Sequence, residues 1–193
     1  MLLMENTILK KYTDQTQEET VIIPEGVTEI ASLAFSRRSK VKSIIIPSTV
    51  QKIAYHAFQG TGIESIIIPD TVTEIGEGLF EDCRRLTSAV IGKNITKIPH
   101  GTFRYCQLLE HLELPEGLEY VGDNAFEECY TLKTAWVGGK EYHISGSEVP
   151  KAVELVFNSL EKTRQRLWDY YESGLMDEFE YVDFQIAGDG YSY

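Results

Sequence analysis

The sequence lacks the long apolar runs and leader segments that take proteins into or across membranes. No stretch approaches the roughly 18 consecutive apolar residues of a membrane-spanning helix. Residues 1–12 also lack a basic segment followed by continuous apolar residues and a small-residue cleavage site. We therefore expect no membrane insertion and a cytoplasmic location. The alternative is a secreted or cell-surface location, if a leader has been removed.

Basic residues are scarce as well. Lys and Arg number 18 against 30 Asp and Glu, which gives a formal net charge of -12. Beyond Arg166 the chain has no Lys or Arg, and its last part is rich in acidic and aromatic residues. Binding to a phosphate backbone depends on clustered Lys and Arg. The composition therefore excludes nucleic acid as the expected partner.

Few residues suit catalysis or metal binding. The segment 75–78 has two glycines but neither the strand-to-helix context nor the lysine of a phosphate loop. The histidines share no metal-ligand spacing: His56, His100, His111 and His143. The cysteines recur at equal intervals: Cys83, Cys106 and Cys129. A disulfide and a soft-metal site are both open for them, but their odd number favours buried structural thiols. We predict no enzymatic activity, cofactor or metal.

What the chain does have is a strong internal repeat. A unit of about 23 residues begins at Pro24 and restarts at four later positions: Pro47, Pro69, Gly92 and Pro115. One position of the unit is always aromatic: Phe35, Phe58, Phe80, Phe103 and Phe126. A single unit cannot bury its apolar side chains, whereas stacked units align equivalent residues about 4.8 Å apart in ladders. The repeat therefore predicts a solenoid.

The unit reads I-P-x-x-V-x-x-I-x-x-x-A-F-x-x-C-x-x-L-x-x-I and resembles the BspA-like leucine-rich repeats of bacteria over about residues 21–138. Gly92 and Gly138 replace the usual proline, and Leu79 and Thr102 replace alanine before the Phe. The resemblance implies an α/β solenoid: a right-handed leucine-rich-repeat coil with a parallel strand-lined face. It also implies a role in adhesion or protein binding, without catalytic residues.

Flanking segments are expected to close both ends of the coil. Residues 7–12 and 20–23 are typical of short strands, and residues 140–144 suit a last strand or hairpin. We therefore divide the chain into an N-terminal cap (1–23), five repeats (24–137) and a C-terminal cap (138–193).

The C-terminal cap is expected to contain a long helix. Ser147 is a plausible N-cap, apolar residues then recur at helical spacing, and Gly174 is a suitable stop. This helix is predicted to cover the last repeat, with docking on a partner as the alternative. In the acidic tail, alternation at 182, 184 and 186 suggests a strand that packs on the solenoid or binds in trans.

Alternation along the closing strand of each unit predicts two ladders that point to solvent. If Ile44 and Ile46 enter the core, Ser43 and Ile45 point outward. The first ladder holds Thr20, Ser43, Ser65, Ser88, His111 and Thr134. The second holds Ile22, Ile45, Ile67, Val90, Glu113 and Trp136. Such an apolar stripe marks a contact surface, although β-branched residues also reflect strand propensity.

The sequence thus predicts a noncatalytic protein-protein interaction module that uses this strand-lined face. The candidate partner-binding residues are Ile22, Ile45, Ile67, Val90, His111, Glu113 and Trp136. The alternative is a surface adhesin that binds a host matrix protein or glycan, with the Ser/Thr ladder and Trp136 as contacts. The partner is a protein of unknown identity, and a homodimer through the apolar strand face or the C-terminal segment is a further possibility.

Overall fold

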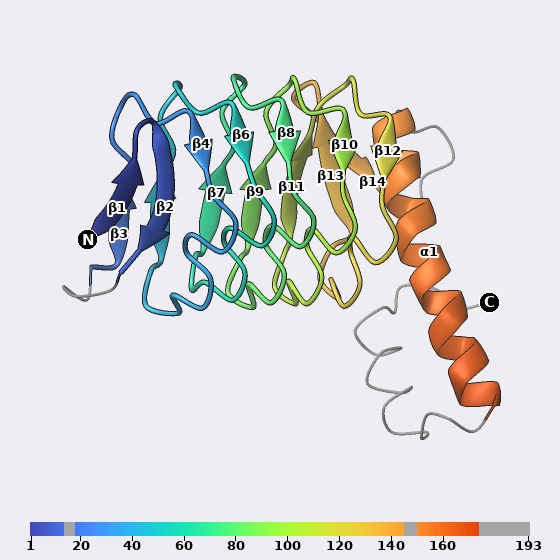
Figure 1. Cartoon of the computed structure of the whole chain (residues 1–193). Helices are drawn as coiled ribbons and strands as arrows, with labels where there is room; N and C mark the ends of the chain where they lie inside the picture. The colour runs from blue at the N-terminus through green and yellow to red at the C-terminus, as the bar shows by residue number, and fades with distance from the viewer. Residues whose placement is uncertain (14–17, 145–149, 174–193) are drawn as a thin grey trace.

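The chain forms a parallel β-solenoid with a helix at its C-terminal end (Figure 1). This computed structural model describes residues 1–13, 18–144 and 150–173, without the side chains of Leu167 and Tyr171. The elements are β1 (Leu2–Glu5), β2 (Ile8–Tyr12), β3 (Thr20–Ile22), β4 (Glu29–Ile30), β5 (Ser43–Ile45), β6 (Lys52–Ile53), β7 (Ser65–Ile67), β8 (Glu74–Ile75), β9 (Ser88–Val90), β10 (Lys97–Ile98), β11 (His111–Leu114), β12 (Tyr120–Val121), β13 (Thr134–Val137), β14 (Lys140–His143) and α1 (Lys151–Glu172).

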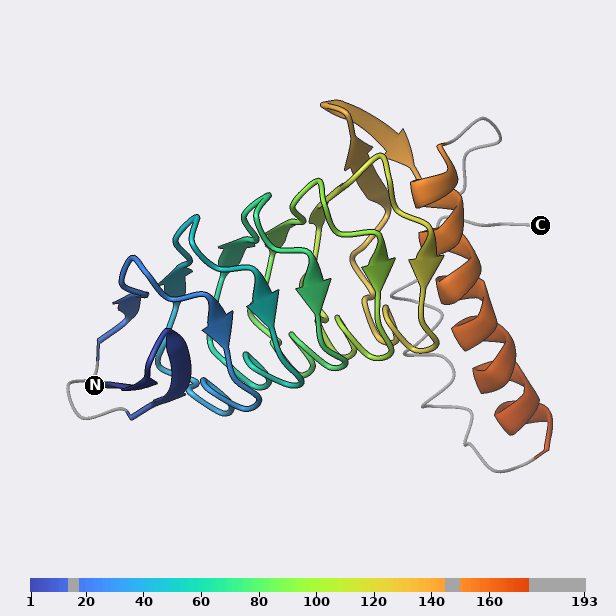
Figure 2. The same ribbon diagram turned by 45° about the horizontal axis from the view of Figure 1, so that its top comes forward.

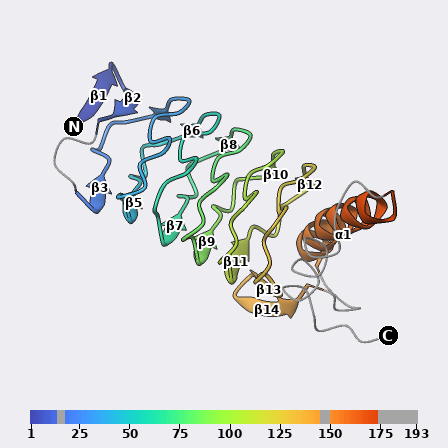
Figure 3. The ribbon, with the colours of Figure 1, turned by 90° about the horizontal axis from the view of Figure 1, so that it is seen from below.

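Each coil contributes one strand to each of two curved sheets that face one another across the core. Strand pairing is interrupted once in each sheet, between β5 and β7 on one side and between β8 and β10 on the other. Seen from below, β2, β4, β6, β8, β10 and β12 line one side, and β3, β5, β7, β9, β11 and β13 line the other (Figure 3). Equivalent residues pair in parallel register, as in Ile66 with Ala89 and Ile30 with Ile53. This arrangement confirms the predicted solenoid.

A stack of aromatic rings fills the centre of the turn that joins the two sheets. Phe35, Phe58, Phe80 and Phe103 have no exposed surface. Ring centroids of neighbouring coils lie 5.3 to 5.7 Å apart along the repeats. The stack begins one coil early, because Tyr12 lies 5.4 Å from Phe35. The segment before Pro24 therefore forms a coil of the same kind.

The turn around each Phe contains two columns of residues in the left-handed region of φ. The first column, two residues before the Phe, holds Leu33, His56, Gly78, Gly101 and Asn124, with φ between 52° and 62°. The second, two residues after it, holds Arg37, Gly60, Asp82, Tyr105 and Glu128, with φ between 59° and 64°. Between the two columns, the backbone amide of the Phe donates a hydrogen bond to a carbonyl of the next coil. The amide of Phe35, for example, donates to the carbonyl of Ala57 at 2.7 Å. The stacking hydrogen bonds therefore continue around the turn.

The second repeat is one residue shorter than the others, and Gly62 lies where the residue is missing. A Cβ added to Gly62 would lie 2.0 Å from the carbonyl oxygen of Ser39 in the preceding coil. Because that contact is with backbone, it cannot be relieved by a side-chain rotation. Glycine thus lets the shortened coil keep register with its neighbours.

At the N-terminal end, the predicted strands at 7–12 and 20–23 are present as β2 and β3, and they belong to opposite sheets. β2 pairs in parallel with β4, and β3 pairs in parallel with β5. The sequence did not predict β1, which pairs antiparallel with β2 and forms the outer strand of its sheet.

At the C-terminal end, β14 returns antiparallel to β13 and confirms the predicted hairpin. α1 then packs against β12 and β13 of the last coil and extends beyond it (Figures 1 and 2). Its buried face includes Ala152, Val153 and Val156. Polar contacts add to this packing, since the Ser159 hydroxyl donates to the Gly122 carbonyl at 3.4 Å. The predicted helix covering the last repeat is therefore confirmed. Ser147, Gly174 and the predicted strand at 182–186 lie outside the described residues.

Candidate functional site: the strand-lined face

The outer face of the sheet that runs from β3 to β13 carries the two predicted ladders. Alternation within each strand places Ile44, Ile66 and Leu112 in the core, each at most 5% exposed. Their neighbours therefore point away from it. Parallel pairing then lines up Ile22 with Ile45, Ile67 with Val90, and Glu113 with Trp136. The structure thus brings these predicted residues together on one face.

Exposure along the apolar ladder falls from the N-terminal to the C-terminal half. Ile22 is 65% exposed, Ile45 51% and Ile67 66%, whereas Val90 is half-buried. Beside these isoleucines the first ladder offers only small hydroxyl side chains: Thr20, Ser43 and Ser65. Nothing bulky on that ladder shields the isoleucines.

The C-terminal half of the same face is polar and aromatic. Glu113 and Trp136 are half-buried, and the His111 ring lies 5.5 Å from the Trp136 ring at an angle of 47°. The hairpin adds Glu141, which pairs with Trp136 in the antiparallel register of β13 and β14. Glu141 was not predicted as a site residue, because its position depends on the hairpin register rather than on the repeat.

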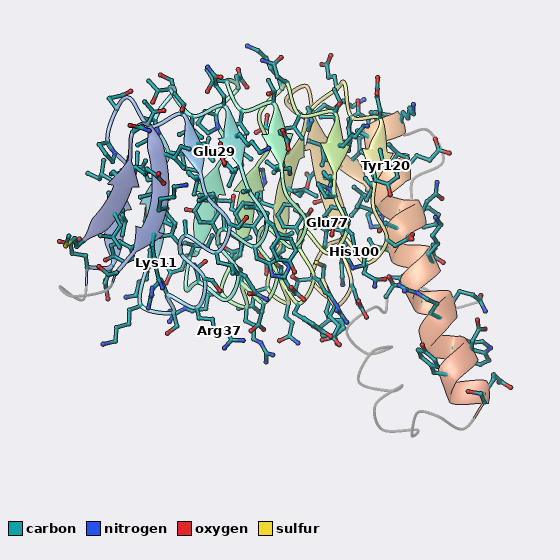
Figure 4. The ribbon with its side chains drawn as sticks, in the orientation of Figure 1. Lys11, Glu29, Arg37, Glu77, His100 and Tyr120 are labelled. Carbon is teal, nitrogen blue, oxygen red and sulfur yellow. The ribbon has the colours of Figure 1, made fainter. Side chains whose placement is uncertain are left out.

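The opposite sheet presents charged residues where the strand-lined face presents isoleucines. Its outward column holds Glu29, Lys52, Glu74, Lys97 and Tyr120. Glu29 on β4 and Tyr120 on β12 lie along the upper part of this sheet (Figure 4). Lys52 forms an ion pair of 2.9 Å with Glu74, which raises the Lys52 pKa chiefly through the hydrogen bond. The two sheets thus differ in outward chemistry although both consist of short parallel strands.

The three cysteines form a buried ladder of free thiols. Each Sγ donates to the carbonyl of the Phe one coil earlier, at 3.2 Å: Cys83 to Phe58, Cys106 to Phe80 and Cys129 to Phe103. Burial raises the pKa of Cys83 to about 12 and moves those of Cys106 and Cys129 in the same direction. Of the three readings of the cysteine spacing, the geometry supports buried structural thiols.

Arg38 takes the place of a cysteine in the first repeat. Its Nε donates to the carbonyl of Tyr12 at 3.2 Å, which is the equivalent of the thiol-to-carbonyl bond of the later coils. The half-buried guanidinium is thus part of the first turn, a role that the sequence did not indicate.

A row of polar and charged side chains follows the turns, one residue after each Phe. Arg104 lies between two carboxylates, with its Nε 2.7 Å from Glu127 and its Nη1 3.8 Å from Glu81. Glu81 also accepts a hydrogen bond from Gln59 at 3.1 Å and lies 3.4 Å from His56 Nε2. These groups bind one another from coil to coil, so the row stabilises the stack.

Residues 1–13, 18–144 and 150–173 contain no group of three or more His, Cys, Asp or Glu arranged to hold a metal ion. Within those same ranges, no helix is both long and apolar enough to cross a membrane.

Comparison with solved structures finds several bacterial leucine-rich repeat proteins. A leucine-rich repeat protein of T. pallidum is 28% identical, with a TM-score of 0.62 over 66% of this chain and 62% of that one. The pneumococcal vaccine antigen PcpA is 26% identical, with a TM-score of 0.57 over 67% of this chain and 34% of that one. The chain therefore spans less than two thirds of the length of either protein.

A leucine-rich repeat protein of Eubacterium ventriosum has the same fold, at 22% identity and a TM-score of 0.58 over 80% of this chain and 46% of that one. A search of curated proteins gives no match. The family model described as BspA type leucine-rich repeat region matches residues 6–135 in six copies. The sixth copy agrees with the coil that the structure shows before Pro24. The chain therefore belongs to the BspA type leucine-rich repeat family.

Proposed function

We propose that this chain is a noncatalytic interaction module that binds a protein partner on its strand-lined face. The contact residues are Ile22, Ile45, Ile67, Val90, His111, Glu113 and Trp136. The observation that carries the proposal is the row formed by Ile22, Ile45 and Ile67, each more than half exposed and each at the same position of successive coils. Exposed apolar rows of this kind mark contact surfaces on soluble proteins.

The opposite sheet argues against strand propensity as the reason for these isoleucines. Its strands β4, β6 and β8 are also parallel, with two residues each against three in β5 and β7, yet their outward positions hold Glu29, Lys52 and Glu74. Charged residues are therefore compatible with outward positions in this coil. Because isoleucine costs solubility at such a position without being needed for folding, its recurrence on one face supports a role in binding.

Arginine substitution on this face tests the proposal. The variant Ile45→Arg/Ile67→Arg places two charges in the row, and Gln51→Arg/Thr73→Arg places two charges on the opposite side of the second and third repeats. Affinity capture from a lysate of the source organism is compared for wild type and both variants, after circular dichroism has verified that each is folded. We expect a protein that binds wild type and the control variant but not the strand-face variant. A protein lost only from the control variant would contradict the proposal.

A second copy of the chain is one protein that could occupy the face. Sedimentation of the purified chain over a range of concentrations distinguishes this case. A homodimer through the row predicts dimers for wild type and monomers for Ile45→Arg/Ile67→Arg. Dimers in both would instead indicate a contact through another part of the molecule, such as the C-terminal segment.

Adhesion to a glycan is the second candidate function. It is supported by the hydroxyl ladder beside Trp136, because hydroxyls supply hydrogen bonds and an indole supplies a stacking platform for a sugar ring. One similar structure is a vaccine antigen, which agrees with an exposed cellular location. A glycan array probed with wild type and Trp136→Ala tests this. Binding that depends on Trp136 would support adhesion, and a silent array would oppose it.

A further inference from the structure

Three residues lie in one line across neighbouring strands at the C-terminal end of the strand-lined face. Glu113 on β11 pairs with Trp136 on β13, and Trp136 pairs with Glu141 on β14. All three point outward, because their strand neighbours Leu112 and Ala135 are buried. Directly paired residues have Cβ atoms about 5 Å apart. The indole of Trp136 is therefore flanked by a carboxylate on each side.

The indole is held in place while both carboxylates remain available. His111 packs against it at 5.5 Å on the same face. Neither Glu113 nor Glu141 forms an ion pair with another residue in the described ranges. Lys140, the basic residue of the same hairpin, lies instead over the ring of Tyr142 at 5.0 Å.

This arrangement suits a side-chain cation. Trp gives the strongest cation-π contact of the aromatic residues, and a cation over its ring would also be within a few ångströms of both carboxylates. A guanidinium or ammonium group would thus be attracted from three directions. A carboxylate at the same place would be repelled, and the net charge of -12 acts in the same sense.

The position of this trio relative to the isoleucines defines the chemistry of the partner. β13 is two strands beyond β9 in the sheet, so Trp136 lies about 10 Å from Val90 at the end of the apolar row. A partner that contacts both would present an apolar patch and a basic side chain about 10 Å apart. In an extended segment this corresponds to about three residues.

We propose that Glu113, Trp136 and Glu141 form a subsite for a lysine or arginine side chain of the protein that lies on the strand-lined face. This subsite rests on the proposed function, because it is the polar end of the same contact surface. It sets the orientation of the partner, since the outward strand positions at the isoleucine end carry no carboxylate: Thr20, Ile22, Ser43, Ile45, Ser65 and Ile67.

Selection from a displayed library of random dodecapeptides tests the subsite. The library is selected against wild type, against Glu113→Gln/Glu141→Gln and against Glu77→Gln/Glu119→Gln. The last variant is the matched control, because it removes two exposed charges that lie next to β8 and β12 of the opposite sheet. We expect wild type and control to enrich peptides with Arg or Lys about three residues from an apolar cluster. The strand-face variant should lose the basic preference and keep the apolar one.

A synthetic peptide of the enriched sequence then measures the effect. Trp168→Phe leaves Trp136 as the only tryptophan, so its fluorescence reports binding at this position. Replacing the basic residue of the peptide by norleucine should weaken binding about tenfold at low salt, and the difference should shrink as salt is raised. In Glu113→Gln/Glu141→Gln the two peptides should bind nearly equally.

The outcomes separate the subsite from the proposed function. If wild type selects apolar peptides without a basic residue, and Ile45→Arg/Ile67→Arg does not bind those peptides, the subsite is overturned and the proposed binding face is supported. A basic preference that survives Glu113→Gln/Glu141→Gln would also overturn the subsite. Peptides that bind wild type and Ile45→Arg/Ile67→Arg equally would overturn both.

Discussion

Two columns of apolar residues recur with the same spacing in this molecule but differ in burial. Phe35, Phe58 and Phe80 recur from coil to coil and are fully buried, while Ile22, Ile45 and Ile67 recur with the same period and are more than half exposed. The repeat period therefore tells which residues align and not whether the column faces the core. Burial follows from the turn geometry for the Phe column and from alternation along the strand for the Ile column. Stability thus depends on one column of the repeat, and the proposed recognition on another.

The largest effect is expected from removing a ring from the buried ladder. Phe80→Ala leaves a cavity between Phe58 and Phe103 and should lower the free energy of unfolding by about 3–5 kcal/mol. Ile67→Ala on the exposed ladder is the matched change and should cost less than about 1 kcal/mol. Urea unfolding of both variants measures the difference. Similar losses for the two variants would contradict the separation of roles.

A smaller loss of stability is expected at Gly62, where the backbones of two neighbouring coils approach closely. Gly62→Ala places a methyl group against the carbonyl of Ser39, so the coils must shift, at a cost of about 1–3 kcal/mol. Gly117→Ala is the control, because no atom lies within 4 Å of its added Cβ. Thermal unfolding of both variants checks this. If Gly117→Ala destabilises as much as Gly62→Ala, coil spacing is not the cause.

Much of this comparison was predictable from the sequence, and the failures have physical causes. The Phe column and the outward isoleucines follow from the period and from strand alternation. The left-handed columns do not, because residues such as Leu33, His56 and Tyr105 occupy them without a glycine signature. The hydrogen bond that Arg38 donates in the thiol column was not predicted, because arginine shares no chemistry with cysteine beyond donating a hydrogen bond. Glu141 depends on the turn at Gly138 and Gly139, whose positive φ values set the hairpin register.

An intermediate loss of stability is expected in the column of buried thiols, because it is a polar column inside the core. Cys106→Ala removes the donor to the Phe80 carbonyl and should cost about 1–2 kcal/mol. In wild type the raised pKa values and burial should make all three thiols nearly unreactive to a thiol reagent at about pH 8 until the chain unfolds. Timed labelling in native buffer and in urea measures this. Rapid labelling of the native protein would show that the column is open to solvent.

The smallest effect is expected at the exposed polar positions. Asp70 forms an ion pair of 2.8 Å with Lys93 and accepts a hydrogen bond from its amide, which lowers the Asp70 pKa below its usual value of 3.8. A carboxyl group with a lowered folded-state pKa stabilises the fold above its unfolded-state pKa and loses this contribution as the pH falls through the folded-state pKa. Wild type should thus be slightly more stable than Asp70→Asn at neutral pH. The gap should close well below pH 3.8. A gap that widens in acid would contradict this sign.

Because the coils stack at a constant spacing, the number of repeats sets the length of the proposed binding face. Each coil of about 23 residues adds one strand to the face and lengthens it by about 4.8 Å. Duplication or loss of one repeat in the gene would therefore move the isoleucine end away from Trp136, or toward it, by one fixed step. The chemistry of each end would be unchanged. The size of the partner that fits could then be adjusted by repeat number alone, without a substitution in the residues proposed to make contact.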